Sequence, residues 1–111
     1  MDEVARVAIV TGGGTGIGAA TACELGRQGV AVAVTGRRPA VLEQTVAEIR
    51  GAGGRGLAIP ADMADLGAPG RIVEAVVAAW GRIDLLVNNG IYQGPGIMSP
   101  VEELTQRHLH D

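Results

Sequence analysis

The sequence contains no lysine and no phenylalanine, and cysteine, serine, tyrosine and tryptophan each occur once. Without lysine, the chain cannot form a Schiff base through a side chain or use a catalytic lysine. Aromatic residues make up 2% of the chain and the formal net charge is −3. A surface that stacks nucleic-acid bases is therefore not expected, and nucleic acid is excluded as a predicted partner.

The single cysteine, Cys23, excludes a disulfide within the chain. It falls in an expected helix, where a small buried hydrophobe is a commoner role than a reactive thiol. The sequence shows no secretory signal pattern and no apolar run of membrane-spanning length. We therefore expect no membrane partner and a cytoplasmic location.

Glycine, by contrast, is abundant, with 18 of 111 residues. This is more than twice the usual share of about 7%. Many positions must therefore allow a tight turn or a close approach of the backbone to another group. The length suits one hydrophobic core, and we predict a single domain over residues 1–111.

The spacing of apolar residues alternates between strand and helix periods. Strands are predicted at residues 4–10, 30–35, 56–60 and 83–87. Helices are predicted from the end of the loop 11–18 to about residue 28, over 39–51 and over 72–80. This βαβαβαβ order predicts an α/β, Rossmann-type parallel sheet with helices on both faces and strand order 3-2-1-4. The ligand crevice is expected above the first and fourth strands.

The C-terminal residues suggest a further element. Ser99 and Glu102 fit a capping box that would begin a fourth helix. We therefore interpret the chain as the N-terminal half of such a fold, apparently truncated. The fourth strand would then lie at the edge of the sheet with an apolar face, so we expect self-association or a homo-oligomer.

The loop at residues 11–18 reads TGGGTGIG and joins the first predicted strand to the first predicted helix. Glycines at this place let the backbone approach a pyrophosphate, which the N-terminus of the helix stabilises through its N–H groups and dipole. Glycines can gather in any turn, but their position inside a βαβ unit indicates a dinucleotide-binding loop.

This loop matches the signature T-G-x-x-x-G-I-G at every fixed position. Three further stretches agree with motifs of the protein family that carries this signature: Thr35-Gly36-Arg37-Arg38, Asp62-Met63 and residues 84–89 (DLLVNN). Of these, residues 84–89 match the family's fourth strand and the start of its Asn-Asn-Ala-Gly motif. Over essentially its whole length the sequence resembles the classical short-chain dehydrogenases/reductases. It departs from them where Gly90-Ile91 replaces Ala-Gly, close to the expected nicotinamide ribose.

The resemblance implies the cofactor-binding portion of an NAD(P)-dependent oxidoreductase. In it Asp62 and Met63 would line the adenine pocket and Asn88 would contact the cofactor. The alternative for Asp62 is a cap on the turn that follows it. The alternative for Asn88, as for Asn89, is a structural role in which the side chain satisfies backbone groups between strands. The candidate cofactor-binding residues are Thr11, Gly12, Gly14, Thr15, Gly16, Ile17, Gly18, Arg37, Arg38, Asp62, Met63, Asn88 and Gly90.

The end of the second strand bears on the choice of nucleotide. Many Rossmann units carry an acidic residue there that binds the adenosine ribose and repels a 2′-phosphate. Arg37 and Arg38 occupy this place, and two guanidinium groups suit a phosphate dianion. The alternative is that both are solvated surface charges. We predict NADP(H) in preference to NAD(H), with Arg37 as the first candidate for the phosphate contact.

The residues of hydride-transfer chemistry are not found. The resemblance implies a Tyr-x-x-x-Lys pair, but Tyr92 is followed four residues later by Gly96. The cluster of His108, His110 and Asp111 is not expected to bind a metal, since residues two apart do not share a helical face. No catalytic residue is assigned.

We therefore predict the cofactor-binding half of an NADP(H)-dependent enzyme that interconverts a secondary alcohol and a ketone. A 3-oxoacyl thioester or a similar small carbonyl compound is the candidate substrate. The chain alone is expected to have no turnover. The alternatives are a non-catalytic NADP(H)-binding module and an inactive fragment.

Overall fold

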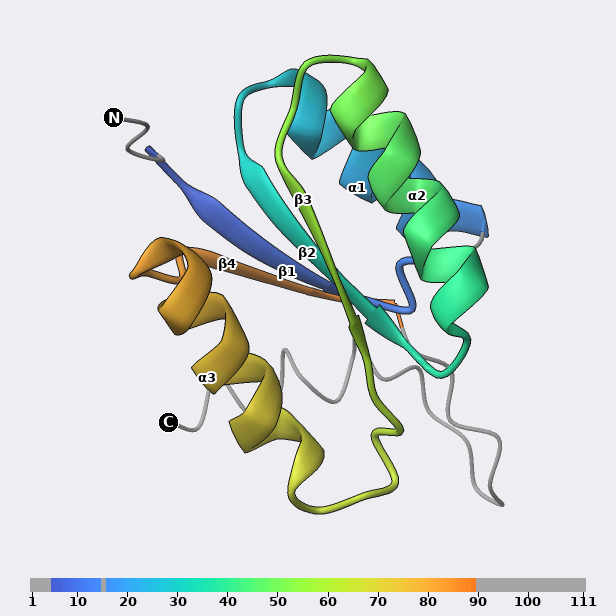
Figure 1. Cartoon of the computed structure of the whole chain (residues 1–111), viewed down its shortest axis with the longest axis vertical. Coiled ribbons are helices and arrows are strands. Elements are labelled where there is room, and N and C mark those ends of the chain that lie inside the picture. The colour runs from blue at the N-terminus through green and yellow to red at the C-terminus, as the bar shows by residue number, and fades with distance from the viewer. Residues whose placement is uncertain (1–4, 15, 90–111) are drawn as a thin grey trace.

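A computed structural model describes residues 5–14 and 16–89 (Figure 1). The strands are β1 (Val7–Thr11), β2 (Ala31–Gly36), β3 (Gly56–Pro60) and β4 (Leu85–Asn88). The helices are α1 (Gly16–Arg27), α2 (Pro39–Gly51) and α3 (Ala68–Trp80). The predicted alternation of strands and helices is confirmed over this part of the chain.

The four strands form one parallel sheet in the order β3-β2-β1-β4, as predicted. In this register Thr11, the last residue of β1, lies opposite Thr35 of β2 and Asn88 of β4. The segments that follow all four strands therefore leave from the same edge of the sheet. Parallel α/β sheets bind their ligands at this edge.

Helices cover both faces of the sheet: α1 and α2 lie on one side and α3 lies on the other (Figure 1). Successive side chains of a strand point to opposite faces, so β1 and β2 contribute to two cores. The core under α1 and α2 contains Val10, Ala22, Val32, Val34, Leu42, Val46 and Ile49. The core under α3 contains Val7, Ile9, Ala31, Ala33, Ile72 and Val76.

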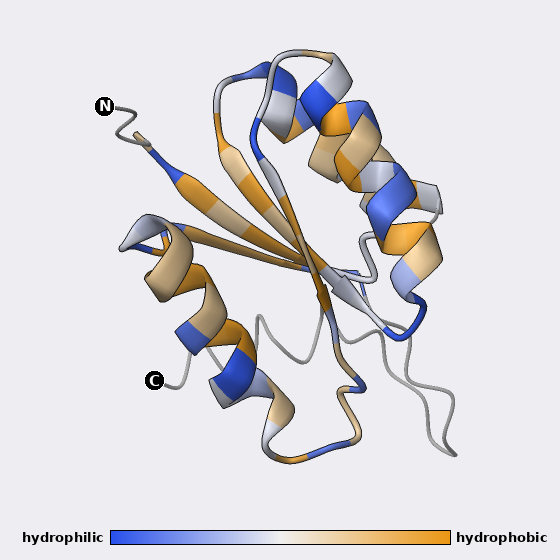
Figure 2. Cartoon of the chain, in the orientation of Figure 1, coloured by the Kyte–Doolittle hydropathy of each residue, from blue (hydrophilic) through white to orange (hydrophobic). Residues whose placement is uncertain are grey.

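Burial on both faces explains why the central strands consist almost entirely of apolar residues. All five residues of β1 are buried, as are the first five of β2. Figure 2 shows the two strands as hydrophobic along most of their length. Because β1 and β2 are held in the core, the loop after β1 and the turn after β2 begin at fixed places on the carboxyl edge of the sheet.

Asp84 holds the start of β4 against the start of β1. Its carboxylate accepts hydrogen bonds from the Val7 N–H (2.8 Å) and, through both oxygens, from the Arg82 guanidinium (2.8 and 2.9 Å). The backbone N–H of Asp84 donates to the Val7 carbonyl oxygen at 2.9 Å. The Arg82 guanidinium, followed by the Val7 N–H, lowers the pKa of Asp84 below its usual value.

Some boundaries differ from the prediction. The first strand begins at Val7 rather than at residue 4, and the fourth begins at Leu85 rather than at residue 83. Asp84 precedes β4, and its carboxylate binds Arg82 and the Val7 N–H. The third helix begins at Ala68, four residues before the first large apolar residue of its stripe. Its first turn buries only Ala68, which is too small to mark the period of a helix.

The predicted capping box at Ser99 and Glu102, Tyr92 and the C-terminal histidines lie outside the described residues. Within residues 5–14 and 16–89, no helix is long and apolar enough to span a membrane. The cytoplasmic location and the single domain stay predictions.

Candidate functional site

The loop between β1 and α1 is shaped by glycine. Gly12 and Gly16 have φ values of 64° and 57°, in the left-handed region that favours glycine. Gly18, in the first turn of α1, packs directly on the Gly12 carbonyl group. The Gly13 N–H donates to the Thr35 carbonyl oxygen at 3.3 Å, which fixes the loop to the end of β2.

The N-terminus of α1 is open. Among the described residues, and apart from its chain neighbours and the backbone of its own helix, no atom lies within 4 Å of the position that a β-carbon on Gly16 would occupy. The next residue, Ile17, is apolar and yet 78% exposed. The first turn of α1 contains no acidic side chain. A surface of this kind accepts an anionic group on the backbone N–H groups and lets apolar parts of a ligand cover Ile17.

The turn after β2 carries two arginines. Arg37 and Arg38 are exposed and, within the described part of the chain, neither forms an ion pair or a side-chain hydrogen bond. By contrast, Arg27, Arg71 and Arg82 each pair with a carboxylate at 3.0 Å or less. The guanidinium groups of Arg37 and Arg38 are therefore available to an external anion.

A cavity of about 280 Å³ joins the loop after β1 to the turn after β2. Its lining consists of Gly12, Gly14, Gly36, Arg37, Arg38, Val41 and Leu42. Four of the predicted cofactor-binding residues thus lie around one space. Val41 and Leu42 fall in the helix predicted over residues 39–51 and were not among the predicted cofactor-binding residues. Their position in the first turn of the helix that follows Arg37 and Arg38 is the sequence signal that could have identified them as cavity residues.

Thr11 and Asn88 lie at the junction of β1 and β4 and do not line this cavity. The Thr11 hydroxyl donates to the Asn88 side-chain oxygen at 2.8 Å and accepts from the Asn89 N–H at 3.0 Å. The Thr11 side chain therefore ties the two strands together. The side-chain nitrogen of Asn89 is buried and has no hydrogen-bond partner among the described residues.

Asp62 and Met63 follow β3 at the same edge of the sheet. The Ala61 N–H donates to the Gly36 carbonyl oxygen at 2.8 Å, which places this segment beside the turn after β2. One carboxylate oxygen of Asp62 accepts the Ala64 N–H at 2.9 Å, so the turn-cap alternative is realised. Met63 is half exposed. The predicted residues Thr15 and Gly90 lie outside the described part of the chain.

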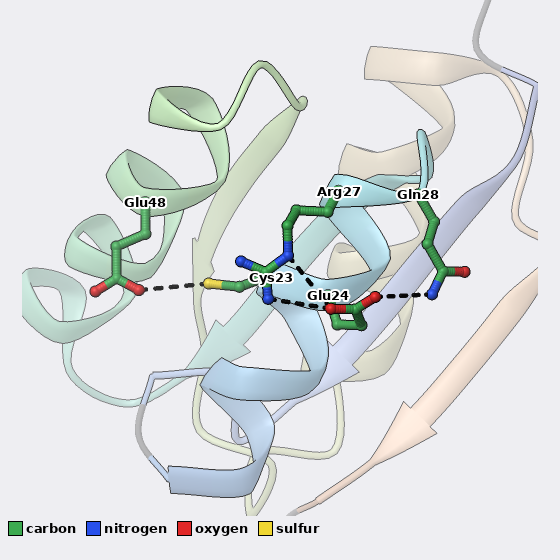
Figure 3. Close-up of polar contacts among 5 residues, drawn as sticks. All are labelled: Cys23, Glu24, Arg27, Gln28 and Glu48. Carbon is green, nitrogen blue, oxygen red and sulfur yellow. Dashed lines mark hydrogen bonds and ion pairs between the residues drawn. The ribbon is translucent and has the colours of Figure 1, made fainter.

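Cys23 belongs to α1, faces Glu48 of α2 and is only partly buried, whereas the sequence predicted a buried residue. Its thiol donates to a Glu48 carboxylate oxygen at 3.4 Å (Figure 3). Burial, followed by the hydrogen bond to Glu48, raises the pKa of the thiol, which disfavours the reactive thiolate. Over the same described ranges, no three histidine, cysteine, aspartate or glutamate residues are grouped to hold a metal ion.

Comparison with known proteins places these features in a family. The family model described as short chain dehydrogenase matches residues 6–111. The chain is 42% identical over 90 residues to the short-chain dehydrogenase/reductase homolog YusS of Bacillus subtilis, covering 80% of this chain and 83% of that protein. It is 40% identical over 105 residues to an uncharacterized oxidoreductase of Methylorubrum extorquens, covering 93% and 41%.

The fold has a solved counterpart in the F189W variant of actinorhodin polyketide ketoreductase, determined with NADPH. The TM-score is 0.76 at 37% sequence identity, and the match covers 83% of this chain and 35% of that one. The chain thus spans most of YusS but less than half of the other two proteins.

Proposed function

The chain belongs to the short-chain dehydrogenase family, and on that premise we propose that it forms the NADP(H)-binding part of an oxidoreductase. One observation carries the proposal: Arg37 and Arg38 line the same cavity as Gly12 and Gly14. A ligand that carries a diphosphate and a second phosphate can use both groups of residues at once. The nicotinamide of such a ligand supplies a hydride to a carbonyl carbon or takes one from an alcohol.

The residues fit the phosphorylated end of the cofactor. The open backbone at Gly16 suits the diphosphate. The guanidinium groups of Arg37 and Arg38, which pair with no other described residue, suit a 2′-phosphate dianion. No acidic residue stands at the end of β2 to repel that phosphate. The cavity of about 280 Å³ places both arginines beside two glycines of the loop, an arrangement that suits a phosphorylated ribose.

The remaining candidates extend the site along the carboxyl edge of the sheet. Asp62 keeps one carboxylate oxygen for the adenine amino group, and half-exposed Met63 would pack on the ring. Asn88 and Gly90 would contact the ribose next to the nicotinamide. We propose a small carbonyl compound or alcohol, such as a 3-oxoacyl thioester, as the substrate of the complete enzyme. The ketoreductase named above, solved with NADPH, supports this choice.

Calorimetric titration with NADPH and NADH tests the proposal, using the 111-residue chain and its Arg37→Ala variant. Loss of a charge-assisted contact should weaken NADPH about 10- to 100-fold and change NADH binding by less than about threefold. Arg27→Ala is the matched control, because Arg27 pairs with Glu24 on α1 and does not line the cavity. Equal weakening of both nucleotides by Arg37→Ala would remove the phosphate role.

A non-catalytic NADP(H)-binding module is the second candidate, favoured by the absence of lysine from these 111 residues. YusS shows that a similarly short member of the family occurs, since a 90-residue match covers 83% of it. If the protein in its natural context binds NADP(H) but transfers no hydride, the non-catalytic module is the correct function. An inactive fragment would bind neither nucleotide.

A further inference from the structure

The start of α2 lies against the glycine loop. A β-carbon on Gly14 would sit 2.8 Å from Val41 Cγ1 and 3.4 Å from Val41 Cβ. Carbon atoms in ordinary contact are about 3.5–4.0 Å apart. The loop therefore reaches its present position beside α2 only because residue 14 has no side chain.

Val41 cannot easily move out of the way. A valine in a helix has one strongly preferred χ1 rotamer, and the position of its β-carbon is fixed by the backbone. The next residue, Leu42, is 1% exposed and anchors the first turn of α2 in the core. Leu42 Cδ2 lies 3.5 Å from the β-carbon positions of both Gly14 and Gly36, so it supports the loop and the arginine turn together.

We propose that Val41 is a positioning residue whose contact with Gly14 sets the separation between the glycine loop and the turn bearing Arg37 and Arg38. The inference rests on the proposed function, because it concerns how one ligand meets both segments. A nucleotide with a 2′-phosphate bridges the two segments, whereas one without it depends mainly on the loop. The separation therefore affects the preference for NADPH over NADH more than the affinity for a diphosphate.

A double-mutant cycle with Gly14→Ala, Val41→Ala and the double variant tests this pairing. Gly14 does not have a positive φ, so alanine is accepted by the backbone and the clash is the only cost in the free protein. Gly14→Ala should weaken NADPH at least about tenfold and NADH less than about threefold. Adding Val41→Ala should return NADPH binding to within about threefold of that of the Val41→Ala chain.

If the double variant binds NADPH as weakly as Gly14→Ala, the new methyl group blocks the ligand itself and the role of Val41 is overturned. An unchanged nucleotide preference in Gly14→Ala overturns it as well. Gly70→Ala is the matched control, because its β-carbon would meet no atom of another described segment within 4 Å. Its nucleotide preference should be that of the unmodified chain.

Thermal unfolding of the unmodified chain, the two single variants and the double variant distinguishes failure of this inference from failure of the proposed function. If the unmodified chain binds neither nucleotide, the proposed function fails. The contact itself is still read from the melting temperatures: Gly14→Ala should lower the midpoint, and Val41→Ala should relieve part of that loss. Additive changes in the midpoint would show that the two residues are not coupled, and would overturn the inference.

Discussion

A β-carbon on Gly18 would overlap the carbonyl oxygen of Gly12. This close approach brings the first turn of α1 onto the loop that follows β1. It therefore aims the N-terminal N–H groups of α1 at the carboxyl edge of the sheet, where the cavity lies.

We predict that Gly18→Ala lowers the free energy of unfolding by about 1–3 kcal/mol or more, since the backbone must shift to accept the methyl group. Gly70→Ala, in the open first turn of α3, should leave stability unchanged or raise it by up to about 1 kcal/mol. Urea unfolding followed by circular dichroism measures both. Equal stability of the two variants would contradict the packing role of Gly18.

Asp84 should make stability depend on pH in the acid range. Its pKa in the folded chain is lowered from the usual 3.8 by Arg82 and the Val7 N–H. A carboxylate with a lowered pKa stabilises the fold above its unfolded-state value, and this contribution is lost as the pH falls through the folded-state value. We expect Asp84→Asn to be less stable than the unmodified chain at about pH 7, with the difference shrinking below about pH 4.

Urea titrations across that range check the prediction. Arg82→Gln serves as the companion variant, because it removes the first cause of the shift while leaving the Asp84 carboxylate in place. A stability difference between Asp84→Asn and the unmodified chain that stays constant from pH 7 down to pH 3 would show that ionisation of Asp84 is not involved.

The edge of the sheet should drive self-association of the 111-residue chain. β4 is the edge strand beside β1, and Leu85 and Leu86, on opposite faces, are each 45% exposed. Exposed apolar edge strands recruit other chains, and lysine on the edge discourages this. The double variant Leu85→Lys, Leu86→Lys should sediment closer to a monomer than the unmodified chain. Leu66→Lys, at an exposed loop residue, should change nothing.

An unmodified chain that is monomeric at every concentration reached in sedimentation velocity would contradict this prediction. It would mean that the two leucines are covered, or that the edge of β4 does not pair with another copy.

Turnover by the chain alone is not expected. Hydride transfer to a carbonyl requires a proton donor near the reacting oxygen, and the 111 residues offer no tyrosine–lysine pair. NADPH oxidation in the presence of small ketones and 3-oxoacyl thioesters should proceed at the rate of the protein-free control. A faster rate, from a sample shown by calorimetry to bind NADPH, would refute the prediction and require another proton donor.

Much of the fold follows from the sequence because local and long-range signals agree. The apolar strands and the glycine-rich connections predict a parallel sheet, and the observed order β3-β2-β1-β4 is the predicted one. The boundaries of helices and strands are less predictable where a side chain near the boundary forms a hydrogen bond with a different strand or helix. Asp84 is an example, since it binds the Val7 N–H, 77 residues earlier in the chain.

The sequence motifs identify candidate residues of the site, but they do not reveal which helix residues pack around it. The loop glycines and both arginines were identified from their positions between elements. Val41 and Leu42 were not, because periodicity alone assigns them to the core, and only the packing of α2 on the loop reveals them as cavity residues. The hydrogen bonds of the Thr11 hydroxyl with Asn88 and Asn89 were not predicted either, because they join residues 77 and 78 positions apart in the chain. The cofactor contact of Thr11 stays a prediction.

We propose above that the loop after β1 and the turn after β2 hold the phosphates of one nucleotide. Titration of the ¹⁵N-labelled chain with adenosine 2′,5′-bisphosphate, followed by NMR, tests it most directly. Saturable shifts are predicted at the amides of Gly12, Gly14 and Gly16 and at Arg37, with α3 unchanged. Shifts confined to α3 or β4, or the absence of any saturable shift, would contradict the account.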